Sequence, residues 1–451
     1  MIRGMTDDER LKQAQRPQQI ASRLHKFYRG KMETVPKCAV RRLDDFSVWY
    51  SPGVATPCSE IQRDPGLVYD YTSKWNTVAV VSDGSRVLGL GNIGAKAGLP
   101  VMEGKALLYK YLGGVDAVPI MLDTRDPDEI IRTVLLMQPA FGGINLEDIE
   151  QPKCFRVLDT LRREAEIPVW HDDQQGTATV TLAALLNALK LTGRTIENSS
   201  IAFIGSGASN VACARLIFGR GADPGACYMV DSQGILGPHR EDVKARRSEF
   251  AEKWRLCEIT NRAGRTGGIP EALRDVDAVI SLSRPEPGTI RPEWVRSMRK
   301  DPIVFACANP TPEIWPWEAT EAGAAVVATG RSDFPNQVNN SLCFPAIFRG
   351  ALDVRAHSIT DEMCFAAAEA LADAVQGELG PERIIPTMEE REVFPNVAAA
   401  VARKAQEQGV AALKLDRAAL LRSADEMIGR SQRLTAMMLE KGFIAPPEEE
   451  L

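Results

Sequence analysis

Short apolar runs alternate along the first part of the chain with longer stretches that have helical periodicity. The runs Thr77–Ser82 and Val118–Leu122 have the length and β-branched content of buried strands. Helices are predicted over 105–111 and 127–137. Strands that alternate with helices predict a parallel sheet with helices on both faces.

The alternation of strands and helices starts again at Ser200. Before it, the Ala/Leu-rich stretch 178–191 predicts a buried helix, and a further helix is predicted over 211–218. Beyond Arg355 the sequence becomes helical and rich in charged residues. This pattern predicts a doubly wound, Rossmann-type fold with C-terminal helices, whose strands lie at Ile201–Ile204, Cys227–Val230, Ala278–Leu282, Ile303–Ala306 and Ala325–Ala328.

The length of 451 residues exceeds what one hydrophobic core usually supports, so two domains are predicted. The first is an α/β domain over 1–170, and the second is a dinucleotide-binding domain with C-terminal helices over 171–451. The polar segment that ends near Lys31 is predicted to hold one short helix, Pro17–Phe27. Segments of this kind often pack on a partner subunit.

Composition excludes several classes of partner. The net charge of −6 and the lack of a dense basic block argue against nucleic-acid binding. No run approaches the ~18–20 apolar residues that cross a bilayer, and the polar start is unlike a signal peptide, so a cytoplasmic protein is expected. The nine cysteines form no C-x-x-C pair and only four histidines are present, so buried, reduced thiols are expected rather than disulfides or a zinc site.

Two glycine-rich loops compete as the site for a dinucleotide pyrophosphate. The loop G-L-G-N-I-G, residues 89–94, matches the dinucleotide fingerprint, but A-K-A-G-L-P follows it, which is poor material for a helix. The second loop lies between a predicted strand and a predicted helix, whose N-terminus would attract phosphate. We therefore predict that the coenzyme binds at Gly205, Ser206, Gly207, Ala208, Ser209 and Asn210, although a plain tight turn is the alternative.

An acidic residue near the end of the next strand usually binds the adenosine ribose, and Asp231 has this position. Ser232 and Gln233 follow it and offer no cation for a ribose phosphate. The sequence therefore favours NAD over NADP, without excluding NADP.

Two acidic pairs follow predicted strands. Glu147 and Asp148 follow A-F-G-G-I, and Asp172 and Asp173 follow I-P-V-W-H. Carboxylates at the ends of parallel strands suit magnesium or manganese, which prefer oxygen ligands. For either pair alone, a helix cap or a solvated loop is the more ordinary interpretation. His171, beside the second pair, is expected to orient the loop rather than to act in catalysis.

The chain resembles the bacterial-type malic enzymes, in family order from about Leu24 to Ala412. The resemblance rests on Y-S-P-G-V-A at 50–55, S-D-G-S-R-V-L-G-L-G-N-I-G at 82–94, P-V-M-E-G-K at 100–105, F-G-G-I-N-L-E-D-I at 141–149, H-D-D-Q-Q-G-T at 171–177, A-N-P-T-P-E-I at 308–314 and G-R-S-D-F-P-N-Q-V-N-N at 330–340. It implies the short form, without a phosphotransacetylase-like extension. Gln175 and Asn210 depart from the common pattern.

The resemblance also implies roles for single residues. Lys105 corresponds to the general base, Tyr50 to the general acid, and Asp172 to a polar catalytic neighbour of the metal. Arg86, Asn309 and Asn340 correspond to substrate-binding residues, with Asn309 also near the nicotinamide. Glu147, Asp148 and Asp173 correspond to the ligands of Mg²⁺ or Mn²⁺. The family further implies a homodimer or homotetramer.

The expected reaction is oxidative decarboxylation of L-malate to pyruvate and carbon dioxide with NAD or NADP. It requires that Tyr50, Lys105, Glu147, Asp148 and Asp173 converge, and that the pKa of Lys105 falls well below its usual ~10.4. Without the family, Lys105 would be interpreted as a surface cation and Tyr50 as a packing aromatic. Two alternatives remain: malolactic conversion of malate to lactate, and a non-catalytic dinucleotide-binding oligomer.

Overall fold

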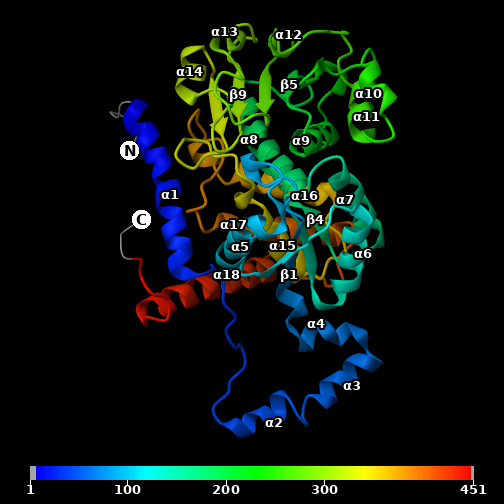
Figure 1. Cartoon of the computed structure of the whole chain (residues 1–451), viewed down its shortest axis with the longest axis vertical. Helices are drawn as coiled ribbons and strands as arrows, with labels where there is room; N and C mark the ends of the chain where they lie inside the picture. The colour runs from blue at the N-terminus through cyan, green and yellow to red at the C-terminus, as the bar shows by residue number, and fades with distance from the viewer. Residues whose placement is uncertain (1–6, 448–451) are drawn as a thin grey trace.

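Two α/β units make up the body of the computed structural model, which describes residues 7–447 (Figure 1). Each unit is built on its own sheet, so the predicted architecture, a parallel sheet followed by a Rossmann-type sheet, is confirmed. The first residues of the polar N-terminal segment, 1–6, lie outside the described part. Within residues 7–447, no helix combines the length and apolar character needed to cross a membrane.

The first sheet has four parallel strands. Alternate side chains of strand β1 (Thr77–Ser82) face opposite sides of the sheet. Val78 and Val80 pack with the helical layer on one side, and Ala79 and Val81 pack with the layer on the other. Both faces of the sheet are therefore buried, as parallel sheets require. The strand order is β2 (Asp116–Met121), β1 (Thr77–Ser82), β3 (Gly143–Leu146) and β4 (Val169–His171).

The second sheet has six strands, all parallel except the last, short one. Its order places the first strand of the unit, β5, at the centre, beside β8 and β6. The order reverses between β5 and β8, and ligands of doubly wound folds bind at such a point. The strands are β10 (Val326–Thr329), β9 (Ile303–Ala306), β8 (Ala278–Ser281), β5 (Ile201–Ile204), β6 (Tyr228–Asp231) and β7 (Gly234–Ile235).

Helices cover both sheets and continue beyond them. Those of the first unit are α5 (Gly94–Gly113), α6 (Pro127–Met137) and α7 (Lys153–Glu164). The long helix α8 (Thr177–Leu191) joins the units. The second unit and the C-terminal part contain α9 (Ala208–Gly219), α10 (Glu241–Ala245), α11 (Ala251–Ile259), α12 (Ile269–Leu273), α13 (Pro292–Val295), α14 (Pro316–Glu321), α15 (Phe344–Asp353), α16 (Asp361–Asp373), α17 (Val393–Glu407) and α18 (Arg417–Glu440).

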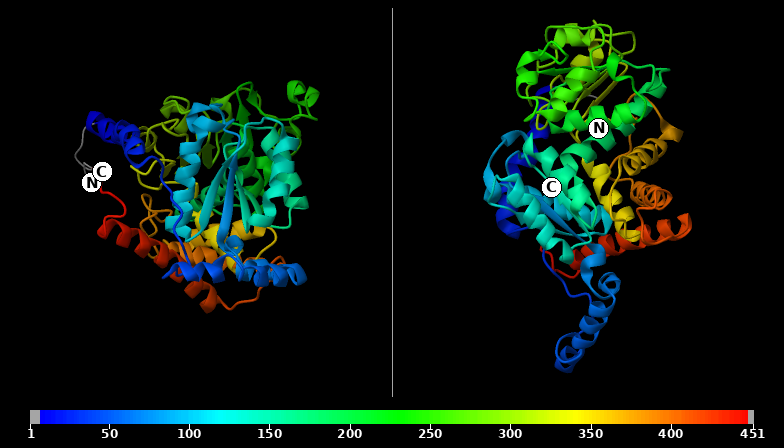
Figure 2. Two further views of the ribbon diagram at one scale, coloured as in Figure 1. Left: turned by 60° about the horizontal axis from the view of Figure 1, so that its bottom comes forward. Right: turned by 90° about the vertical axis from the view of Figure 1, so that its right-hand side faces the viewer.

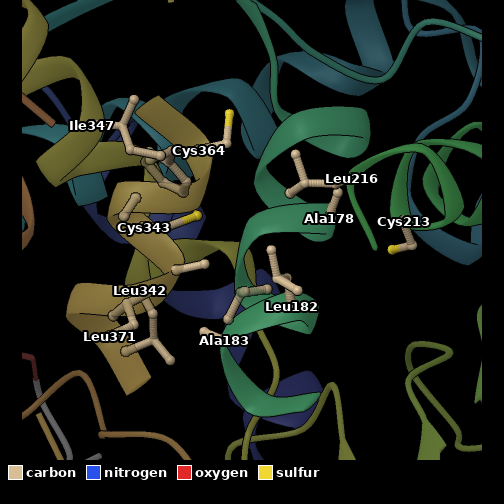
Figure 3. Close-up of a cluster of buried hydrophobic side chains, with 14 of the residues drawn as sticks. Ala178, Leu182, Ala183, Cys213, Leu216, Leu342, Cys343, Ile347, Cys364 and Leu371 are labelled. Atoms are coloured by element: carbon tan, nitrogen blue, oxygen red, sulfur yellow. The ribbon is translucent and has the colours of Figure 1, made fainter. Parts of the chain in front are cut away.

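A continuous apolar core joins the two units around α8. Leu182 and Ala183 of this helix face Leu342 and Leu371 from the C-terminal helical region (Figure 3). Seven of the nine cysteines are buried, which confirms the expectation of mostly buried cysteines, and none of the nine forms a disulfide.

Helix α5 is longer than predicted. It begins at Gly94, directly after the G-L-G-N-I-G loop, and contains Pro100. The judgement that this loop leads into poor helical material was therefore wrong. Tertiary packing overrides the weak local propensity, because Ala95, Gly98 and Met102 recur at helical spacing and are buried. A Cβ on Gly98 would lie 3.1 Å from Met121 Cε, so a small residue is needed there.

The C-terminal helices do not pack on the second sheet alone. Helices α15 and α18 pack against α5 of the first unit, and α16 packs against α8. Strand β4 of the first sheet, Val169–His171, also crosses the predicted boundary at residue 170. The division of the chain into domains at 1–170 and 171–451 therefore stays a prediction.

The segment before the first sheet leaves the body of the molecule. Helix α1 (Asp7–Tyr28), longer than the predicted Pro17–Phe27, lies along the body, and Tyr28 Oη donates to the Ala445 carbonyl at 2.8 Å. Residues 32–73, which we call the arm, then project away from the body (Figures 1 and 2). The arm contains α2 (Phe46–Trp49), α3 (Ala55–Arg63) and α4 (Val68–Tyr71).

Candidate active site

A cleft of about 750 Å³ opens between the two sheets. Loops that follow the carboxyl ends of the strands line it from both sides. From the first unit come Glu147 after β3 and Asp173 after β4, and from the second unit come Gly207 after β5 and Ser283 after β8. Ligands of parallel sheets collect at this end of the strands, so the cleft is the expected binding site.

Three carboxylates gather at the wall of this cleft. One oxygen from each of Glu147, Asp148 and Asp173 lies within 4.8 Å of the others. The backbone N–H of Asp148 donates to Asp173 Oδ2 at 2.8 Å, and this contact ties the loops after β3 and β4 together. Asp148 has a positive φ of 54°, an unfavourable backbone conformation that the fold maintains at this position.

The electrostatics of this cluster favour a bound cation. Burial raises the pKa of Asp148 to about 8, and the charge of Asp173 adds to the effect. Burial also raises the pKa of Glu147 well above its ordinary value. Asp148 Oδ2 is buried and has no hydrogen-bond partner. Three oxygen ligands with unsatisfied charge fit a hard octahedral cation such as Mg²⁺ or Mn²⁺.

Lys105 reaches the same cluster from α5. Its side chain is 8% exposed, its Nζ lies 2.9 Å from Glu147 Oε1, and it donates a short hydrogen bond to Asp172 Oδ2. Nζ also lies 4.1 Å from the centre of the Phe344 ring. Burial opposes the charged form, but Asp172 and Glu147 outweigh it and raise the pKa of Lys105. The contacts that the chain itself makes therefore contradict the expectation of a lowered pKa.

Buried neighbours hold the carboxylates in place. Asn145 Nδ2 donates to Glu147 Oε2 at 2.8 Å, and Tyr109 Oη donates to Asn145 Oδ1 at 2.8 Å. Trp170 Nε1 donates to Asp172 Oδ1 at 3.1 Å. Burial lowers the pKa of His171 to about 4, so this ring is neutral. Sequence reasoning missed Tyr109, Asn145 and Trp170, because ordinary core residues carry no local signal of such a role.

A π-helical turn over Asp172–Gly176 places Asp172 opposite Lys105. Such turns frequently occur at functional sites. Gly176 permits the arrangement, because a Cβ at this position would lie 2.0 Å from Asp172 Oδ1.

We therefore expect Gly176→Ala to displace Asp172 and to lower kcat by about 10- to 100-fold, the usual cost of losing an orienting group. Steady-state kinetics with malate measures this loss. Gly377→Ala, where a Cβ meets nothing within 4 Å, is the matched control. Unchanged kinetics of a correctly folded Gly176→Ala protein would show that Asp172 does not need this position.

The predicted coenzyme loop lies on the other side of the cleft. Gly205 follows β5 with a φ of 97°, and a Cβ there would lie 2.8 Å from the Leu282 carbonyl oxygen. Asn210 replaces the third glycine and donates to the Ile204 and Gly205 carbonyls at 2.7 and 2.9 Å. The asparagine therefore braces the turn, and Gly207 immediately precedes α9, whose N-terminus suits phosphate.

Asp231 ends β6 as predicted, but cations surround it. Arg240 donates to both of its oxygens at 2.8 and 2.9 Å, and Lys253 Nζ lies 2.5 Å from Oδ2. The preference for NAD rested on Ser232 and Gln233 alone, and these two cations from later in the chain therefore weaken it. Arg240 and Lys253 lie nine or more positions along the chain, beyond the residues that directly follow the strand. Lys253 and Asp231 both line a second cavity that continues from Gly205 and Gly207.

We expect Lys253→Ala to lower kcat/KM for NADP relative to that for NAD by about tenfold, which corresponds to ~1.4 kcal/mol. The reason is that Lys253 is a partly exposed cation of this cavity, lies beside Asp231, and is placed to pair with a ribose phosphate. The ratio of kcat/KM for the two coenzymes is the measurement. An unchanged ratio would remove Lys253 from coenzyme selection.

The predicted substrate side chains also line the cleft. Arg86, Asn309 and Asn340 all border it, together with Asn339, which sequence reasoning missed. Glu313, within the A-N-P-T-P-E-I motif, was also missed. It is fully buried and accepts hydrogen bonds from Ser281 Oγ, the Ser283 N–H and the Ala308 N–H at 2.7, 2.8 and 3.1 Å. Glu313 thereby fixes the loops after β8 and β9.

Tyr50 is the exception among the predicted site residues. It lies on the arm, is 73% exposed, and does not line the cleft of its own chain. Lys105, Glu147, Asp148 and Asp173 converge as expected, and Tyr50 does not join them.

Comparisons with known proteins agree with this site. Residues 29–162 match the family model "Malic enzyme, N-terminal domain", and residues 174–406 match "Malic enzyme, NAD binding domain". The chain is 48% identical over 92% of its length to the bifunctional malic/malolactic enzyme of Bacillus subtilis, covering 98% of that protein. It is 47% identical over 85% of its length to the NAD-dependent malic enzyme of Geobacillus stearothermophilus, covering 78% of it. The crystal structure of Entamoeba histolytica malic enzyme superposes with a TM-score of 0.94 at 47% identity, covering 98% of this chain and 93% of that one.

Proposed function

The chain belongs to the malic enzyme family, and from this premise we propose that the cleft residues of this chain carry out oxidative decarboxylation of L-malate to pyruvate and carbon dioxide. The reaction of the family is NAD- or NADP-dependent. One observation supports these residue roles above all. Lys105 and Asp172 lie in contact with each other and beside the carboxylates of Glu147, Asp148 and Asp173.

Three residues are proposed as metal ligands: Glu147, Asp148 and Asp173. A divalent cation bound there supplies a Lewis acid that polarises the C2 oxygen and stabilises the enolate formed as carbon dioxide leaves. Gly205–Asn210 and Asp231 are proposed to hold the dinucleotide, which supplies the hydride acceptor. Arg86, Asn309 and Asn340 are proposed to position the carboxylates of malate.

Lys105 is proposed as the base that accepts the proton of the C2 hydroxyl. It must first lose its own proton, and the hydrogen-bonded Asp172 is placed to take it. Burial raises the pKa of Asp172, which makes the protonated acid accessible. Neutralising the nearby carboxylate charges also lowers the pKa of Lys105. The resemblance assigns the proton transfer to C3 of the enolate to the Tyr50 hydroxyl, which lies outside the cleft of its own chain, and Lys105 would then return a proton to the phenolate.

The chain is also proposed to assemble as a homodimer or homotetramer and to act in the cytoplasm. Nine free thiols without a disulfide suit a reducing compartment.

Product analysis tests the reaction. With L-malate, Mn²⁺ and coenzyme, we expect one pyruvate and one reduced coenzyme for each malate consumed. The name of the Bacillus subtilis relative makes malolactic conversion the second candidate. Lactate in place of pyruvate, without accumulation of reduced coenzyme, would support that candidate and contradict the proposal.

A further inference from the structure

Glu313 is a buried carboxylate that none of the proposed chemical steps uses. Its Oε1 accepts hydrogen bonds from Ser281 Oγ at 2.7 Å and from the N–H and Oγ of Ser283 at 2.8 and 3.1 Å. Its Oε2 accepts from the Ala308 N–H at 3.1 Å. A backbone N–H can only donate, and one of them faces each oxygen. Both oxygens must therefore accept, which a carboxylate does and a glutamine side chain cannot.

These hydrogen bonds join two neighbouring loops of the second unit. Ser281 is the last residue of β8 and Ser283 follows it, whereas Ala308 lies just beyond the adjacent strand β9. Ser283 lines both the cleft and the second cavity beside Asp231, and Ala308 lines the cleft. Glu313 lines neither cavity. It therefore controls the wall of the cleft from behind, where the two cavities meet.

Asn309, the residue after Ala308, is confined by backbone from both units. A Cβ on Gly330, which follows β10, would lie 2.6 Å from Asn309 Nδ2. A Cβ on Gly89 of the first unit would lie 3.0 Å from the Asn309 carbonyl oxygen. A larger residue at either position would push on Asn309. The G-L-G-N-I-G loop therefore contacts the second unit at the cleft, and the Ala308 N–H that Glu313 holds immediately precedes this confined side chain.

We propose that Glu313 is a positioning residue for hydride transfer, because it holds the loop of Asn309 at a fixed separation from the loop of Ser283. This inference rests on the proposed function, in which Asn309 positions malate and the coenzyme lies along the cavity that Ser283 lines. The C2–H bond of malate breaks in that step, and its rate depends steeply on the alignment of the two reactants. Glu313 itself exchanges no proton with either reactant, since it lines neither cavity.

Glu313→Gln tests this role, because it keeps the shape of the side chain and replaces one acceptor by a donor. In the protein without metal or coenzyme, we expect faster hydrogen–deuterium exchange of the Ser283 or the Ala308 amide, since one of them loses its acceptor. In a single turnover with malate, Mn²⁺ and coenzyme, we expect the reduced coenzyme to form about 10- to 100-fold more slowly. Malate deuterated at C2 should slow this rate further, which identifies C–H cleavage as the affected step.

The second half of the reaction distinguishes positioning from general damage. Oxaloacetate, the product of malate oxidation, enters after hydride transfer and depends on the metal and on the cluster around Lys105. At saturating oxaloacetate, we therefore expect Glu313→Gln to release carbon dioxide at a rate close to that of the wild type. Coenzyme titration should likewise give an affinity close to that of the wild type.

Two further variants accompany this experiment. Glu318→Gln is the matched control, because Glu318 Oε2 accepts from the Trp315 N–H at 3.1 Å without lining the cleft. It should change neither rate. Ser281→Ala removes one donor and leaves both oxygens of Glu313 in place, so it should slow hydride transfer by about two- to tenfold, the contribution of one hydrogen bond.

A wild-type rate of hydride transfer in folded Glu313→Gln would overturn the proposal. An equal loss of oxaloacetate decarboxylation, or a slowed rate without an isotope effect, would overturn it as well. If Glu313→Gln does not fold, a wild-type rate in Ser281→Ala has the same consequence. A wild-type protein that reduces no coenzyme with malate would instead contradict the proposed function, and this outcome is distinguishable because each variant is compared with the active wild type.

Discussion

Lys105→Met is expected to lower kcat for malate oxidation by about 100- to 10,000-fold, the range that a positioned acid–base group contributes. The substitution keeps the length of the side chain and removes the ammonium that contacts Asp172 and Glu147. Coenzyme binding should be unaffected, because Gly205–Asn210 and Asp231 belong to the second unit. Single-turnover kinetics and coenzyme titration measure the two effects separately.

The matched control for this prediction is Lys110→Met. Lys110 lies on the same helix and pairs with Asp116 at 2.6 Å, outside the cleft. It should leave kcat close to that of the wild type. If Lys105→Met retained turnover while Lys110→Met lost it, the assignment of the base to Lys105 would be wrong.

Asp148→Asn is expected to lower kcat/KM by at least about 100-fold, more than the usual loss for residues that only support metal ligands. It should also remove the rise in melting temperature that Mn²⁺ produces in the wild type, since binding to the folded state alone stabilises it. In EDTA near neutral pH the variant should melt at a higher temperature than the wild type, because burial and the charge of Asp173 raise the pKa of Asp148 to about 8, and a carboxyl with a raised pKa destabilises the folded state above the ordinary pKa of the group.

Differential scanning fluorimetry with Mn²⁺ and with EDTA checks this pair of opposite shifts. Asp128→Asn, on an exposed side chain of α6, is the control. An undiminished Mn²⁺ shift in Asp148→Asn would exclude Asp148 as a ligand.

The strands of both sheets could be predicted because each is a short apolar run between turn residues. The predicted positions of β1, β5 and β9 agree with the structure residue for residue, and those of β2, β6, β8 and β10 differ by one or two residues at their ends. Helix α5 was underestimated for a physical reason. Its first turns contain glycine and proline, and they are stabilised by burial against Met121 and β2 rather than by local propensity.

The part of the candidate site that consists of short motifs at strand ends could be predicted from the sequence. Glu147, Asp148, Asp172 and Asp173 come together because parallel strands end at one edge of the sheet, and Lys105 reaches them from α5. Sequence could not place Arg240 and Lys253 beside Asp231, since the chain returns to that carboxylate only through the tertiary fold.

Tyr50 illustrates the other limit of sequence reasoning. Its motif indicates a chemical role, but no local pattern tells where the segment that carries it lies relative to the cleft. That information lies in the path of the arm, which leaves the first sheet at the end opposite the cleft.

The most direct test of the account is the rate of coenzyme reduction by the wild-type protein with L-malate, measured in Mn²⁺, then in excess EDTA, then after Mn²⁺ is restored. We predict reduction with one pyruvate formed for each reduced coenzyme, loss of the rate in EDTA, and recovery when the metal returns. Absence of malate-dependent reduction with both NAD and NADP, or a rate that EDTA leaves unchanged, would contradict the assignment of this cleft as a metal-dependent malate-decarboxylating site.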